Sequence, residues 1–208
     1  MLYNFLTRTF VRIAKPASTF FLSLALSSNA NSQQTILKEL KVGDKMQEVD
    51  MNAINYPKEK IMLSEFQGKA IILDFWATWC QPCVASFPKM DSLQKKFEDG
   101  LQILPVTYQD KATVNFLFNK MNANSKQRIK LPVTVVNDRQ LSLLFPHSEL
   151  PHYVWISSDG IIKAITDMHQ VTEENVQSFL KSSSFGLPVK KDEKQTVNRR
   201  KPVFLGNN

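Results

Sequence analysis

Residues 70–83 read AIILDFWATWCQPC, and this stretch decides the fold. Its first part, residues 70–76, is a continuous apolar run that holds one acid, Asp74. Such a run is typical of a strand that is buried on both faces of a sheet. From Pro82 onward, apolar residues recur at spacings of three and four as far as Phe97, which indicates one face of a helix. The sequence therefore predicts a buried strand that leads directly into a helix, with two cysteines at the junction.

Strands and helices alternate along the rest of the body. Short apolar runs predict four further strands, at residues 101–107, 133–136, 153–156 and 161–165. Periodic apolar residues predict helices at 112–121 and 140–145 and a last helix that begins after Thr172. Residues 35–70 are interpreted as an N-terminal segment that leads into the domain. This alternation predicts an α/β fold in three layers.

The formal net charge of +7 lies in the two ends of the chain. Residues 1–30 carry three basic residues and no acid, and residues 189–208 carry six basic and two acidic residues. The stretch between them holds 17 basic and 17 acidic residues and is neutral. The charge balance therefore gives no reason to expect a nucleic-acid partner for the body of the protein.

The first end has the layout of a secretory signal peptide. Residues 1–30 begin with basic residues, continue into an apolar run at 17–26 and end in small residues. That run is too short to span a bilayer core of about 30 Å, although an uncleaved membrane anchor remains open. We expect an exported, periplasmic protein with one domain at 31–185. Residues 186–208 are interpreted as a linker or disordered tail that could lead to a further domain.

Cys80 and Cys83 are the only cysteines of the chain, and their spacing favours redox chemistry. A helix N-terminus lowers the pKa of a thiol, and the thiolate is the species that attacks a disulfide. We therefore predict that Cys80 attacks and that Cys83 resolves the mixed disulfide. A zinc site would have to recruit His147 or His152, and a c-type haem would need histidine where Val84 stands. A purely structural disulfide also remains open; neither a metal nor an organic cofactor is expected.

Residues 74–83 resemble the active site of the thioredoxin superfamily. The spelling WATWC at 76–80 and the motif LSEFQGK at 63–69 are most similar to the exported TlpA/ResA-type thiol-disulfide oxidoreductases. The similarity covers residues 40–182. It implies a thioredoxin-like fold with a central mixed sheet and an insertion around residues 108–135.

The resemblance also implies roles for two residues outside the cysteine motif. Asp74 matches the buried acid of thioredoxins, where burial would raise its pKa and let it accept the proton of Cys83. The alternative is an acid that faces solvent at a strand end. Pro151 matches the cis-proline that faces the disulfide, which would leave the backbone of Leu150 free to pair with an extended substrate. A trans proline at the start of a strand is the alternative.

Further candidate substrate contacts surround the cysteines, namely Trp79, Gln81, Pro82, Leu150 and His152. Trp79 is expected to pack, to shield the disulfide or to contact a partner. His152 is the histidine next to the predicted site and would lower a thiol pKa if it were charged. Its side chain could instead face away across the strand.

The resemblance implies thiol-disulfide exchange with protein substrates, in the reducing direction. An example is keeping apo-cytochrome cysteines reduced for cytochrome c maturation, with a membrane-bound thiol-disulfide donor or acceptor resetting the pair. The chain departs from the ResA type at Ser86, where that type has glutamate, and at Leu150, where a hydroxyl or small residue precedes the proline. A disulfide oxidase or isomerase, a peroxiredoxin-like peroxidase and a non-catalytic binding module with a structural disulfide remain alternatives.

Overall fold

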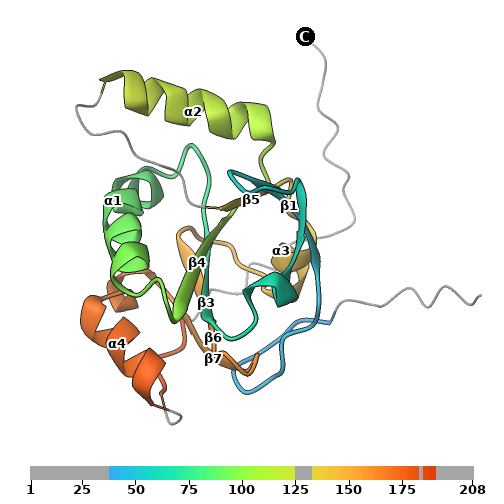
Figure 1. The fold of residues 1–208 in the computed structure, drawn as a ribbon, viewed down its shortest axis with the longest axis vertical. Helices are drawn as coiled ribbons and strands as arrows, with labels where there is room; N and C mark the ends of the chain where they lie inside the picture. The colour runs from blue at the N-terminus through green and yellow to red at the C-terminus, as the bar shows by residue number, and fades with distance from the viewer. Residues whose placement is uncertain (1–37, 125–132, 183–184, 191–208) are drawn as a thin grey trace, which may run out of the picture. The chain divides into compact units, whose positions relative to one another are not determined.

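The computed structural model describes residues 38–124, 133–182 and 185–190 (Figure 1). The expected signal peptide at 1–30 lies outside the described residues, as does the part of the expected tail beyond Lys190. The strands, helices and contacts given below all lie within these ranges.

Every strand and helix predicted from residue 70 onward is present. The strands are β1 (Asp50–Ile54), β2 (Lys60–Met62), β3 (Ala70–Phe75), β4 (Leu101–Val106), β5 (Thr134–Val136), β6 (His152–Ile156) and β7 (Ile162–Thr166). The helices are α1 (Gln81–Lys96), α2 (Lys111–Asn124), α3 (Gln140–Leu144) and α4 (Glu173–Lys181). Helix α2 lies within residues 108–135, where the TlpA/ResA-type insertion was expected. The predicted boundaries agree with the observed ones to within a few residues, because caps and turns mark the ends.

The strands form one mixed sheet in the order β2-β1-β5-β4-β3-β6-β7. Strand β3 runs parallel to β4 and antiparallel to β6, so the predicted mixed sheet is confirmed. Strand β3 has a neighbouring strand on each side and packed side chains on both faces, which explains why its run AIILDF is buried throughout. The end of this central strand is where the two cysteines follow.

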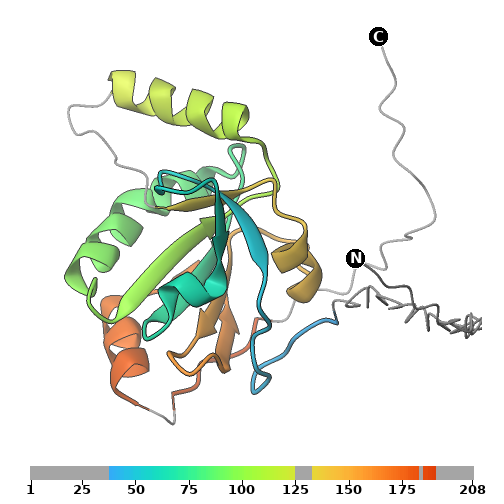
Figure 2. The same cartoon turned by 45° about the vertical axis from the view of Figure 1, so that its right-hand side comes forward.

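Helices cover both faces of the sheet, as the three-layer prediction requires (Figure 2). Alternate β3 side chains point to opposite faces. Ile71, Leu73 and Phe75 pack with α3 and the N-terminal segment. Ala70 and Ile72 pack with α1 and α4 on the other face. By this alternation, Asp74 points to the face that α1 covers.

The N-terminal segment differs from its prediction because it joins the sheet. Strands β1 and β2 pair antiparallel, and β1 continues the sheet through antiparallel pairing with β5. The apolar side chains of Met51, Ala53 and Ile61 are buried in the core. These strands have only five and three residues and contain Asp, Asn and Lys, which are uncommon in strands. The partner β5 of strand β1 lies far along the chain, so the sequence carries only a weak strand signal.

The start of the expected tail also packs on the domain. The backbone N–H of Lys190 donates to the carbonyl of Ile165 at 2.8 Å. The ring of Phe185 lies 5.5 Å from that of Trp155, and Leu187 packs against the same core. The segment from Phe185 to Lys190 therefore contacts the folded body through Phe185, Leu187 and the backbone of Lys190.

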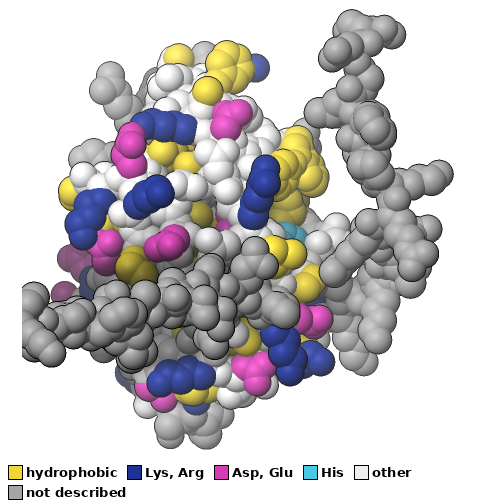
Figure 3. All heavy atoms as spheres, turned by 90° about the vertical axis from the view of Figure 1, so that its right-hand side faces the viewer, with side chains coloured by type: hydrophobic (Ala, Val, Ile, Leu, Met, Phe, Trp, Pro, Cys, Tyr) yellow, Lys and Arg dark blue, Asp and Glu magenta, His cyan; other side chains and the backbone are white. Residues whose placement is uncertain are grey.

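Charged side chains of both signs are interspersed on the face shown in Figure 3, in keeping with the neutral charge balance of the body. Within the described ranges, no helix combines the length and the apolar character needed to cross a membrane.

Candidate active site

The two cysteines lie at the N-terminus of α1, directly after the loop that leaves β3. Cys80 is the N-cap residue, and its sulfur accepts a hydrogen bond from the backbone N–H of Cys83 at 3.4 Å. Pro82 occupies the first turn, where its missing N–H is not needed. Cys80 and Cys83 form a disulfide with a Cα–Cα distance of 5.3 Å. The positive end of the helix dipole thus faces the Cys80 sulfur and favours its thiolate on reduction.

The surroundings of the two cysteines differ. Cys80 is 4% exposed and lies at the surface edge of the motif, whereas Cys83 is fully buried. Gln81 and Pro82 between them are exposed. Trp79 is 65% exposed, so its side chain is largely unpacked and open to a partner. This arrangement leaves Cys80 as the sulfur that an incoming disulfide can approach.

A segment that follows β4 holds the active-site loop in place. The Gln109 side chain accepts the N–H of Thr78 at 2.6 Å and donates to its hydroxyl at 2.9 Å. The indole N–H of Trp79 donates to the Tyr108 hydroxyl at 2.8 Å. These contacts span about thirty positions, and no local motif in the sequence indicated them. They fix the backbone just before Cys80.

The Leu150–Pro151 peptide bond is cis. Pro151 is buried and directly precedes β6, whose first residue, His152, pairs with Phe75 at the end of β3. The proline thus lies beside the start of the active-site loop. Leu150 is half-buried and lines a cleft of about 230 Å³ together with Trp79 and other residues.

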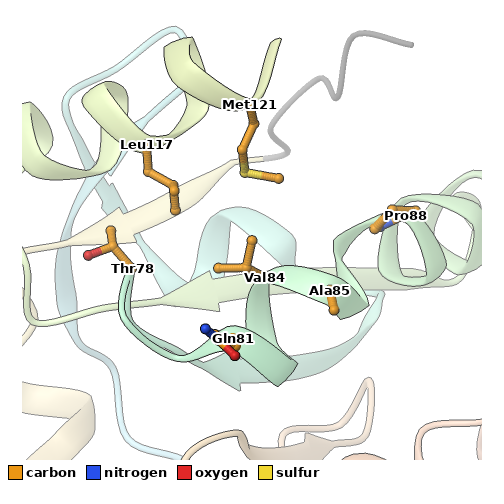
Figure 4. Close-up of a pocket in the computed structure, with 7 residues that line it drawn as sticks. All are labelled: Thr78, Gln81, Val84, Ala85, Pro88, Leu117 and Met121. Atoms are coloured by element: carbon orange, nitrogen blue, oxygen red, sulfur yellow. The ribbon is translucent and has the colours of Figure 1, made fainter. Parts of the chain in front are cut away.

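A second, apolar hollow lies on the other side of the motif, between α1 and α2 (Figure 4). Its volume is about 390 Å³. Leu117 and Met121 point down from α2 toward Val84 on α1, and Gln81 also lines the hollow (Figure 4). The hollow therefore borders Gln81, one of the two residues that separate the cysteines.

Asp74 is completely buried, which contradicts the alternative of an acid that faces solvent. Burial raises the pKa of Asp74 to about 7, and the Tyr153 hydroxyl opposes part of that rise. Among the described residues, neither carboxyl oxygen forms a hydrogen bond of good geometry. The carboxyl is therefore poised to exchange a proton near neutral pH.

Tyr153 is a further residue of this site that the sequence did not indicate. It is the register partner of Asp74 in the β3–β6 pair, and it is fully buried. Burial, followed by the charge of Asp74, raises the pKa of Tyr153 well above its usual value, so the phenol keeps its proton. Its position opposite Asp74 could have been found only from the strand register.

His152 does not occupy the place expected of a substrate contact. It is 2% exposed and lies one residue before Tyr153, so it points to the opposite face of the sheet. Its ring stacks on that of His147 at a centroid distance of 4.7 Å and packs edge-on against Phe75. Burial lowers the pKa of His152 to about 3, with a further contribution from His147. A neutral, buried ring can neither touch a substrate nor supply charge to a thiolate.

The burial of His152 predicts acid sensitivity of the fold. An unfolded chain takes up a proton at this histidine near pH 6.5, whereas the folded protein resists until about pH 3. Stability is therefore lost as the pH falls below 6.5. The free energy of unfolding falls between pH 7.5 and pH 4 in the wild type. We expect this fall to be smaller by about 3 kcal/mol in His152→Phe. Urea unfolding of both proteins at several pH values measures this, and parallel curves would contradict it.

No cluster of three or more metal-ligating side chains occurs among the residues that the structure describes. The zinc alternative would use the thiolates of Cys80 and Cys83, which are joined in a disulfide here. The site thus offers redox-active sulfur, a buried acid and a neighbouring phenol.

The family model described as Redoxin matches residues 41–180 of the chain. The chain belongs to the Redoxin family. It is a ResA/TlpA-type member of the thioredoxin superfamily. This Redoxin chain is 30% identical over 125 residues to the thiol-disulfide oxidoreductase ResA of Bacillus subtilis (strain 168), over 59% of this chain and 65% of that protein. It is 26% identical over 180 residues to ResA of Oceanobacillus iheyensis, over 85% of this chain and 88% of that protein.

Solved structures show the same fold. The thioredoxin domain of a thiol-disulfide oxidoreductase from Bacteroides vulgatus superposes with a TM-score of 0.54 at 19% identity, over 68% of this chain and 99% of that one. A thiol-disulfide oxidoreductase from Bacteroides fragilis gives 0.53 at 17% identity, over 66% of this chain and all of that one. The Redoxin chain therefore has a thioredoxin-like fold. It spans just under two thirds of the B. subtilis ResA that it matches.

Proposed function

We propose that this protein catalyses thiol-disulfide exchange with protein substrates through Cys80 and Cys83. The observation that carries the proposal is the disulfide at the N-terminus of α1, with Cys80 at the surface edge and Cys83 buried. Relatives named thiol-disulfide oxidoreductase ResA support the same chemistry. The exposed Trp79, Gln81 and Pro82 surround Cys80 and are proposed to contact the substrate, as is the backbone of Leu150 beside Pro151.

The reaction runs in two exchanges. The Cys80 thiolate attacks one sulfur of a substrate disulfide, the substrate S–S bond breaks, and the other substrate sulfur leaves as a thiolate. Cys83 then loses its proton to the Asp74 carboxylate and attacks the Cys80 sulfur. The bond between Cys80 and the substrate breaks, and the second substrate sulfur leaves with the electron pair. The substrate is reduced by two electrons, and the Cys80–Cys83 pair is oxidised.

The proposed direction is reduction, in a periplasmic compartment. The expected export signal at 1–30 supports that location. An oxidised product pair requires a thiol donor to reset it, and we propose a membrane-bound one. Substrates of this kind include the cysteines of apo-cytochromes, which must be thiols before haem is attached. In this scheme the cleft that Leu150 lines lies in the path of the incoming chain.

The midpoint potential of the Cys80–Cys83 pair tests the direction. Thioredoxin-like reductants lie near about −270 mV and strong oxidants near about −120 mV. We expect a potential below about −220 mV after equilibration in dithiothreitol buffers, together with reduction of insulin disulfides by the reduced protein. A potential above about −160 mV would reverse the direction. A pair that never equilibrates would leave only a structural disulfide.

A further inference from the structure

Two buried polar side chains face each other beneath α1. Asp74 on β3 and Tyr153 on β6 are register partners, and both are fully buried. They lie on the face of the sheet where α1 packs, since Ile72 and Trp155, two positions away on each strand, belong to the core that α1 and α4 share. A carboxyl and a phenol thus share a site that solvent does not reach.

The third polar group of this site comes from α1. The Ser86 hydroxyl is buried and donates to the carbonyl of Cys83 at 2.7 Å. Both Ser86 and Asp74 influence the pKa of Tyr153, although among the described residues its hydroxyl forms no hydrogen bond of good geometry. The phenol therefore stands between the carboxyl on the sheet and the turn of α1 that carries Cys83.

Few other groups face the Asp74 carboxyl. Strand β4 contributes its register partner Pro105, which carries no ionisable group. The first turns of helix α1, which covers this face, hold the buried Cys83 and Ser86. Trp76, two residues further along the chain from Asp74, has a buried indole N–H with no hydrogen-bond partner among the described residues. Among the described residues, Tyr153 is the only side chain that shifts the pKa of Asp74 beyond burial itself, and it lowers that pKa. When the carboxyl ionises, the phenol O–H is the donor that is placed to compensate its charge.

We propose that the Tyr153 hydroxyl is a positioning group of the exchange reaction, which stabilises the ionised Asp74 carboxylate so that it can accept the proton of Cys83. The inference rests on the proposed function and adds Tyr153 to the residues that take part in it. Tyr153 keeps its own proton throughout. The proton passes from the Cys83 sulfur to Asp74, and the Cys83 sulfur then forms its bond to Cys80 as the substrate sulfur leaves.

The variant Tyr153→Phe removes one oxygen and keeps the ring. Reduced protein is mixed with an aromatic disulfide that releases one coloured thiolate at each of the two exchanges. The second release reports the attack by Cys83. We expect its pH profile to move up by about one pH unit. At pH 7 the variant then has roughly a fifth of the wild-type population of Asp74 carboxylate, and roughly a fifth of the wild-type rate of the second release. The rates of variant and wild type converge above about pH 9, and the first release is unchanged.

Two controls separate positioning from mere packing. Tyr56→Phe removes a phenol oxygen from the loop between β1 and β2, and we expect the profile to stay in place. In an Asp74→Asn background, Tyr153→Phe should have no further effect on the second release, because the group it acts through is gone. An equal loss at every pH, or an equal loss in both backgrounds, would overturn the inference.

A titration of the oxidised protein provides an independent readout. The carbon-13 signal of the Asp74 carboxyl, assigned by its loss in Asp74→Asn, should titrate at higher pH in Tyr153→Phe. If Tyr153→Phe fails to fold, incorporation of 3,5-difluorotyrosine at position 153 gives a stronger donor and should move the midpoint down. An unmoved midpoint would refute the inference even in a protein that exchanges disulfides. If the wild-type protein did not reduce insulin disulfides, the proposed function would be refuted, and the titration of Asp74 would be unaffected.

Discussion

Cys80→Ser is expected to abolish thiol-disulfide exchange, with a loss of at least about a thousandfold in insulin reduction. A serine hydroxyl is not ionised at neutral pH and cannot form the mixed disulfide. The buried Cys83 remains in this variant, but its sulfur is fully shielded from an incoming disulfide. Residual activity should therefore match the uncatalysed reaction with dithiothreitol alone.

Cys83→Ser is the matched variant, because it removes the fully buried sulfur and leaves the Cys80 sulfur at the surface edge of the motif. We expect this variant to attack substrate disulfides and then to stop at a covalent complex through Cys80, since nothing resolves it. Non-reducing electrophoresis and mass spectrometry detect the complex. A pair of variants that both form such complexes would show that Cys83 is accessible and that the assigned roles are wrong. Wild-type function in a Cys80→Ser, Cys83→Ser double variant would indicate a binding module.

The sequence predicted best where local patterns and local chemistry coincide. The run 70–76 is typical of a buried strand, and the apolar spacing after Pro82 is that of a helix, so β3 and α1 were predicted correctly. Apolar runs bounded by turn residues likewise located the helices and strands that follow. Each of these features depends on residues within about ten positions of one another.

Features that depend on distant partners were missed. Strands β1 and β2 are stabilised by pairing with each other and with β5, which begins about eighty residues further on. The contacts of Gln109 and Tyr108 with the active-site loop join segments that only the folded sheet brings together. A single sequence contains no signal for such pairs, because neither partner is unusual in its own surroundings.

The sequence did not show on which face of the sheet each β6 side chain lies, and this determines which of them belong to the site. The strand reads HYVWI and is buried throughout, so no polar alternation shows which side chains point toward α1. The register with β3 answers this by placing Tyr153 opposite Asp74 and His152 opposite Phe75. The sequence drew attention to the histidine near the two cysteines, yet the neighbouring tyrosine is the residue that lies opposite the acid.

Asp74→Asn is expected to stabilise the oxidised protein by about 4 kcal/mol at pH 8. In the unfolded chain this carboxyl loses its proton near pH 3.8, whereas burial holds the proton in the folded protein up to about pH 7. The raised pKa therefore destabilises the fold as the pH rises from about 4 to 7, and the cost is constant above that range. Asparagine has nearly the shape of the neutral acid and carries no ionisation to suppress.

Urea unfolding at pH 4 and pH 8 measures this difference, because at pH 4 the folded acid is neutral in the wild type. We expect the variant to gain its advantage only at the higher pH; an equal gain at both would assign it to packing. The same variant should slow the second exchange at pH 7, since Cys83 loses its proton acceptor. If removal of Asp74 raises stability and slows the attack by Cys83, then the carboxyl destabilises the fold but contributes to the reaction. Such a trade-off between stability and activity would be direct support for Asp74 as the group that receives the proton of Cys83.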